Sequence, residues 1–140
     1  MTRVGFYVVQ AAGEEQRLRV AARLVDKAFS QRGHRTYIHT NDETQARALD
    51  ELLWRIRPAS FLPHGLCGSE GSELIAIGWG DEPAGHDDLL INLQLQIPPF
   101  FSRFHRVAEV VTQDPVSLEA LRASWRFYRE RGYQLEKHDV

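Results

Sequence analysis

Short apolar runs alternate with stretches of helical periodicity along this 140-residue chain, and this alternation constrains its fold more than any other feature. Five runs predict buried strands, at residues 4–9, 36–40, 74–78, 89–93 and 107–112. Three stretches predict helices, at residues 13–32, from Asp42 to the residue before Pro58, and from Pro115 to Arg131. The alternation predicts an α/β fold, a three-layer α/β/α arrangement around an open, mostly parallel sheet of about five strands.

The composition is that of an ordinary globular protein, with 43% hydrophobic and 26% charged residues, and no linker divides it, so residues 1–140 predict a single domain. A net charge of −2 gives no general attraction to nucleic acid. The single cysteine, Cys67, excludes an internal disulfide and a four-cysteine zinc site. No signal-like start and no apolar run near the roughly 20 residues of a membrane span are present, which predicts a cytoplasmic protein.

The second predicted helix places a tryptophan away from its apolar stripe. The stripe consists of four aliphatic residues spaced as one helical face, Leu49, Leu52, Leu53 and Ile56. At about 100° per residue, Trp54 lies roughly 150° from the stripe's centre and is expected to face outward. An outward Trp54, followed by Phe61 in a segment without periodicity, indicates a docking surface. A neighbouring loop that covers Trp54 would explain the same pattern.

The last predicted helix combines an apolar stripe with positive charge. The stripe is formed by residues at i, i+3, i+7 and i+10, Leu118, Leu121, Trp125 and Tyr128. Arg122, Arg126 and Arg129 flank it, an arrangement that suits an acidic peptide with an aromatic residue, because guanidinium groups bind carboxylates with paired hydrogen bonds. The alternative is that the stripe is ordinary core and the arginines are solvated.

No catalytic, metal or nucleotide motif accompanies the predicted Rossmann-like sheet. The first strand is followed by Gly13 alone, without G-x-G-x-x-G or G-K-[ST], and acids occupy the starts of the first two helices. The histidines show no H-x-x-x-H or H-E-x-x-H spacing. We therefore expect no catalytic residue, metal or cofactor. The competing hypothesis is a nucleotide- or metal-dependent enzyme with a site at the carboxyl edge of the sheet, using His64, His86, Asp87 and Asp88.

Seven segments in a fixed order resemble one known family nearly end to end: FYVV, DETQARALDELLW, SFLPHGL, IGWG, DLLINL, PPFFSRF and SWRFYRERGYQL. The chain resembles the chi subunit of bacterial DNA polymerase III, an accessory protein of the clamp-loader complex. The resemblance implies an α/β sheet related to nucleotide-binding folds, without nucleotide chemistry or catalysis. It also implies an adaptor that binds the acidic C-terminal tail of single-stranded-DNA-binding protein and links it to the clamp loader through the psi subunit.

The resemblance also implies positions for both sites. The tail site falls on Val111, Arg122, Trp125 and Arg126: Arg122 would pair with the tail's terminal carboxylate, Val111 and Trp125 would contact its aromatic residue, and Arg126 would meet its acidic side chains. The psi-binding surface falls on Trp54 and Phe61, which related proteins also use for a helicase-like partner. DNA contact is then indirect and the location is at the cytoplasmic replisome. Direct DNA binding by the last helix is disfavoured, because Glu119 and Glu130 interrupt its arginines.

Overall fold

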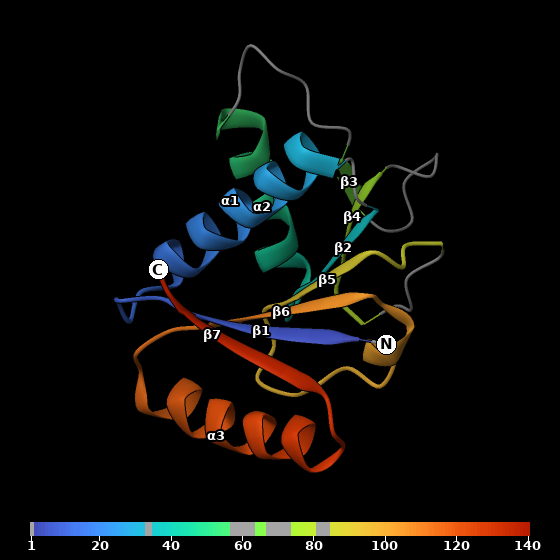
Figure 1. The fold of residues 1–140 in the computed structure, drawn as a ribbon. Helices are drawn as coiled ribbons and strands as arrows, with labels where there is room; N and C mark the ends of the chain where they lie inside the picture. The colour runs from blue at the N-terminus through green and yellow to red at the C-terminus, as the bar shows by residue number, and fades with distance from the viewer. Residues whose placement is uncertain (1, 33–34, 57–63, 67–73, 81–84) are drawn as a thin grey trace.

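A single parallel β-sheet runs through the centre of the structure, and helices cover both of its faces (Figure 1). The computed structural model describes residues 2–32, 35–56, 64–66, 74–80 and 85–140. The strands are β1 (Arg3–Val8), β2 (Thr36–His39), β3 (His64–Leu66), β4 (Ile75–Gly78), β5 (Leu89–Asn92), β6 (Arg106–Val111) and β7 (Gln134–Asp139). The helices are α1 (Glu14–Arg32), α2 (Glu43–Ile56) and α3 (Pro115–Glu130), with a short 3-10 helix, η1 (Phe101–Arg103).

The seven strands lie in the order β3-β4-β2-β5-β6-β1-β7, and every neighbouring pair is parallel. The predicted fold class is therefore confirmed, as an all-parallel sheet. The strand count of about five was too low, because β3 and β7 were not predicted. Both strands lie at the edges of the sheet, and β7 has the polar sequence QLEKHD with no fully buried residue. An edge strand needs little apolar sequence, so hydrophobic periodicity does not reveal it.

Each face of the sheet has its own hydrophobic cluster. α1 and α2 pack on one face, where the buried residues include Val25, Leu53 and Ile77. α3 and the aromatic segment around η1 pack on the other face, where the cluster includes Phe6, Phe104 and Tyr128. Figure 1 shows α1 and α2 above the sheet and α3 below it. This arrangement confirms the predicted three layers.

Alternation along β1 and β6 assigns their side chains to these two faces. Val4 and Phe6 belong to the cluster under α3, as do Val107 and Val111, whereas Ala108 and Val110 belong to the cluster under α1 and α2. Parallel pairing sets Phe6 opposite Glu109 on β6 and opposite Lys137 on β7. The register therefore determines which residues β1, β6 and β7 present to α3.

Local signals in the sequence explain where the helices begin and end. The Asp42 carboxylate accepts a 2.8 Å hydrogen bond from the Gln45 backbone amide, and Asp114 accepts one of 3.0 Å from Ser117. Each caps an amide at the first turn of its helix that has no partner within the helix. Gly132 follows α3 with φ of +81°, a conformation that glycine adopts without steric cost. Pro58, the predicted end of α2, lies outside the described residues.

Candidate functional site

The aromatic residues of α3 pack against β1, and they differ in how deeply they are buried. Tyr128 is fully buried, with its ring centroid 6.0 Å from that of Phe6. Trp125 is only half-buried, although its ring lies 5.1 Å from Phe6. The predicted stripe thus serves two purposes. Tyr128 belongs to the core, as the structural alternative proposed, while Trp125 keeps part of its indole accessible to a ligand.

The two arginines beside Trp125 are exposed and carry no ion pair in the part of the chain that the structure describes. Arg122 precedes Trp125 by one helical turn and Arg126 follows it directly. Three exposed arginines on α1 and α2 instead pair with a glutamate one turn earlier: Arg19 with Glu15, Arg47 with Glu43 and Arg55 with Glu51. The guanidinium groups of Arg122 and Arg126 are therefore available to carboxylates from outside the chain.

Val111 lies at the carboxyl end of β6, on the face of the sheet under α3, and is 8% exposed. A small cavity of about 20 Å³ borders it, together with Phe6, Leu121 and Ser124. A more open and mostly apolar groove of about 350 Å³ lies between α3 and residues 95–101. Neither of these two cavities is lined by Arg122, Trp125 or Arg126. The four predicted tail-site residues thus lie in one layer of the fold, but neither of these cavities is lined by all four.

Two charged residues of this layer were not predicted. The Glu109 carboxylate is buried between β6 and α3, where it accepts hydrogen bonds from the Tyr128 hydroxyl at 2.8 Å and from the Asn92 amide at 2.9 Å. Burial raises its pKa to about 7, although both hydrogen bonds act in the opposite direction. Lys137 shares its register position with Phe6, on an edge strand that the sequence did not predict.

The sequence carries a signal for Glu109, whereas the position of Lys137 became clear only from the structure. Glu109 is the one acid within VAEVVT, a strand otherwise of apolar residues and threonine, which indicates a carboxylate that needs buried partners. Lys137 follows Leu135 by two residues, and Leu135 packs against the cluster under α3. Because side chains alternate along a strand, Lys137 is on that same face, where its ammonium group lies 3.9 Å from the Asp139 carboxylate.

Of the two residues predicted for the psi-binding surface, the structure describes Trp54. Trp54 is 51% exposed, whereas Leu49 and Leu53 of the same helix are fully buried. The outward direction that periodicity assigned to Trp54 is therefore confirmed. Phe61, the second residue of this surface, lies outside the described residues.

The residues of the competing enzyme hypothesis lie at the wrong edge of the sheet. Asp87 and Asp88 come just before β5, and His64 is the first residue of β3, so all three are at the amino edge. The predicted position at the carboxyl edge was wrong. Asp88 also accepts a 2.8 Å hydrogen bond from the Arg35 backbone amide, a structural role. Among the described residues, no group of three or more histidines, cysteines or carboxylates is placed to hold a metal ion.

Arg17 occupies the carboxyl edge, where sheets of this type commonly bind nucleotides. The side chain is 7% exposed, and its guanidinium donates hydrogen bonds to the Leu93 carbonyl at 3.1 Å, the Thr112 hydroxyl at 2.6 Å and the Ser117 hydroxyl at 2.9 Å. These bonds tie α1 to β5, β6 and the start of α3. The arginine is thus committed to protein groups at the place where a phosphate would need it.

Comparison with known families gives a match over almost the whole chain. The family model described as "DNA polymerase III chi subunit, HolC" matches residues 1–136. The chain belongs to this family. The DNA polymerase III subunit chi of Pseudomonas aeruginosa is 46% identical over 138 residues, which cover 99% of this chain and 96% of that protein. The subunit chi of Escherichia coli K12 is 29% identical over 141 residues, covering 96% of each chain.

A solved structure supports the fold independently of sequence. The crystal structure of T4 UvsW matches with a TM-score of 0.64 and 6% identity, and the match covers 99% of this chain and 41% of that one. At such low identity the likeness concerns the fold alone. Chi-family membership makes the chain a component of DNA polymerase III and hence of the replication machinery. Within the described residues, no helix is long and apolar enough to cross a membrane.

Proposed function

We propose that this chi-family chain is a non-catalytic adaptor of the cytoplasmic replisome. It binds the acidic C-terminal tail of single-stranded-DNA-binding protein and links it to the clamp loader through a psi subunit. The observation that carries the proposal is the half-buried Trp125 with exposed Arg122 and Arg126 on either side of it in α3, neither ion-paired within the described chain. Contact with DNA is indirect, through the single-stranded-DNA-binding protein that carries the tail.

The chemistry of such a tail matches these side chains. Its terminal carboxylate pairs with Arg122 and its acidic side chains with Arg126, while its aromatic tip packs on Trp125 near Val111. Burying one aromatic side chain contributes roughly 1.5–3 kcal/mol, and each hydrogen bond to a charged group adds about 1.5–3 kcal/mol. Two or three such contacts, after the cost of ordering the tail, correspond to about micromolar affinity. Salt should weaken the binding, because part of it comes from exposed ion pairs.

The psi subunit is assigned to a separate surface, formed by Trp54 of α2 and Phe61. The exposed indole of Trp54 supports this assignment, because large aromatic side chains commonly anchor protein interfaces. α2 covers the face of the sheet opposite to α3 (Figure 1), so the psi subunit and the tail would bind on opposite sides of the molecule. A helicase-like partner would use this same Trp54 surface.

The tail site is tested by calorimetric titration of a tail peptide into the parent protein and the Arg122→Ala variant. We expect the variant to lose at least about tenfold in affinity, because one charge-assisted contact is removed. Arg23→Ala is the matched control, since Arg23 is an exposed arginine of α1, under the other face of the sheet. Equal affinity of Arg122→Ala and parent, with unchanged circular dichroism, would remove Arg122 from the site.

The two-surface arrangement is tested by a reciprocal pair of variants. Trp54→Ala should weaken binding of a psi subunit and leave the tail affinity unchanged, and Trp125→Ala should do the reverse. Pull-down with psi and titration with the tail peptide measure the two interactions separately. Loss of tail binding in a folded Trp54→Ala protein would contradict separate surfaces.

A further inference from the structure

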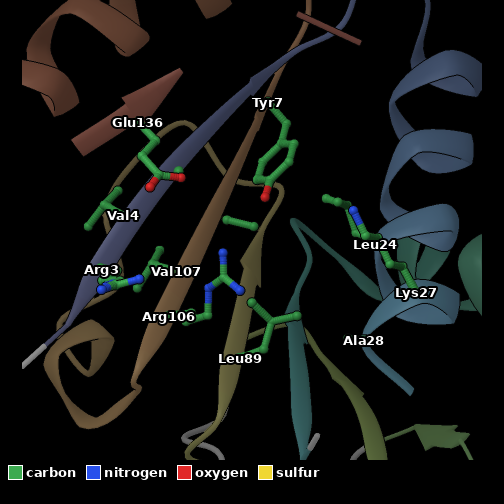
Figure 2. A pocket seen from close by; sticks show the side chains of 12 residues that line it. Arg3, Val4, Tyr7, Leu24, Lys27, Ala28, Leu89, Arg106, Val107 and Glu136 are labelled. Carbon is green, nitrogen blue, oxygen red and sulfur yellow. The ribbon is translucent and has the colours of Figure 1, made fainter. Parts of the chain in front are cut away.

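A third cavity, of about 180 Å³, lies on the other face of the sheet, between α1 and the amino halves of β1 and β6 (Figure 2). Gly5 and Ala108, which are opposite each other on these strands, form its floor and leave the space open because their side chains are absent or small. Leu24 and Ala28 of α1 form one wall. The cavity belongs to neither of the surfaces proposed above.

Positive charge is concentrated at this cavity. Arg3 and Arg106 are directly opposite each other in the β1–β6 register, so their side chains extend from the same face of the sheet, and both line the cavity. Like charges in that arrangement repel. Lys27 of α1 adds a third cation. In the part of the chain that the structure describes, none of these three forms an ion pair.

One acid and one hydroxyl complete the polar lining. Glu136 of β7 lies opposite Gly5 and is 3.3 Å from the His138 ring nitrogen. Three cations and one carboxylate leave a formal charge of +2 around the cavity. Figure 2 shows the Tyr7 hydroxyl and the Arg106 side chain pointing into the space between the sheet and α1. Burial raises the pKa of Tyr7, so its hydroxyl stays protonated and can donate a hydrogen bond.

We propose that this cavity binds a small phosphate monoester with a compact apolar body. A phosphate monoester carries a charge close to −2 near neutral pH, which matches the charge of the lining and relieves the repulsion between Arg3 and Arg106. Guanidinium groups and a tyrosine hydroxyl are suitable donors to its oxygens. The apolar body contacts Leu24, Ala28 and Leu89. A cavity of about 150 Å³ is enough to hold a benzene ring, so a ring next to these residues fits the available volume.

The test is a titration of the purified protein with phenyl phosphate, followed by calorimetry and amide chemical shifts. Inorganic phosphate lacks the ring and benzoate carries a single charge, so these two probes separate the apolar and the charge contributions. We expect saturable binding of phenyl phosphate, with shifts at Gly5, Tyr7 and Ala108, and affinity at least about threefold above either other probe.

Matched variants locate the site. Arg106→Gln should weaken phenyl phosphate binding at least about tenfold, whereas Arg23→Gln, an exposed arginine of α1 outside the cavity lining, should leave it unchanged. Ala28→Leu should fill the apolar side, abolish the advantage of phenyl phosphate and retain inorganic phosphate binding. If Arg106→Gln does not fold, Arg3→Gln replaces it. Absence of saturable binding, equal affinity for benzoate, or full affinity in the folded arginine variant would overturn the proposal.

Discussion

Replacing Glu109 with glutamine should remove a large part of the dependence of folding stability on pH. The Glu109 carboxylate is buried beneath α3, and burial raises its pKa from 4.5 to about 7. Glutamine has nearly the same shape and still presents a polar group to Tyr128 and Asn92, so the variant changes the ionisation and preserves the packing. The hydrogen bonds to these two residues oppose the shift but do not cancel it.

The sign of this pH dependence follows because the pKa of Glu109 is higher in the folded protein than in the unfolded chain. The folded protein binds the Glu109 proton more tightly than the unfolded chain does. Protonated Glu109 therefore adds to the free energy of unfolding; this addition is complete below about pH 4.5 and is lost as the pH rises through about 7. Each pKa unit corresponds to about 1.4 kcal/mol, so the full loss is about 3 kcal/mol in the free energy of unfolding. That is a large fraction of the stability of a typical domain of this size.

Urea unfolding measures this loss at several pH values between about 4.5 and about 8. The free energy of unfolding of Glu109→Gln, relative to the parent, should rise by about 3 kcal/mol across that range. Glu119→Gln, an exposed carboxylate on α3, is the matched control and should keep a constant difference from the parent. A constant difference for Glu109→Gln as well would show that the buried carboxylate does not titrate in this range.

Three further substitutions test other parts of the fold, each by urea unfolding. Tyr128→Phe leaves a Glu109 oxygen without its donor and should cost about 1–3 kcal/mol, more at about pH 8, where the carboxylate is charged, than at about pH 5. Gly78→Ala should cost about 1–3 kcal/mol, because the new methyl group would overlap the hydroxyl of Tyr37, which is fully buried and cannot move aside. Asp114→Ala removes the cap of α3 and should cost about 1 kcal/mol. An unchanged midpoint in any of the three would contradict the contact on which it depends.

The sequence predicted the central strands and all three helices because their signals are local. α2 shows this well: Asp42 caps it, Leu49 and Leu53 define its buried face, and the same periodicity directs Trp54 outward. β7 escaped prediction for a physical reason. An edge strand with one partner, β1, has most of its side chains in water, so its sequence carries almost no apolar alternation.

The candidate site was less predictable, because it depends on contacts between distant segments. Periodicity placed Arg122 and Arg126 beside Trp125, which is a property of one helix. It could not show that Trp125 packs on Phe6, more than a hundred residues earlier, or that Glu109 accepts a hydrogen bond from Tyr128. Those contacts follow from the strand order and register of the whole sheet, which no short window of sequence encodes.

The position of the sheet between Trp54 and Trp125 has a consequence for how an adaptor would work. Partners attached to opposite faces do not exclude each other sterically, and a close-packed parallel sheet between them deforms little. Binding of one should then leave the affinity for the other unchanged, and the effects of Trp54 and Arg122 substitutions should add. Such a protein is a passive spacer of fixed thickness: it holds two assemblies at a constant separation and transmits no signal between them.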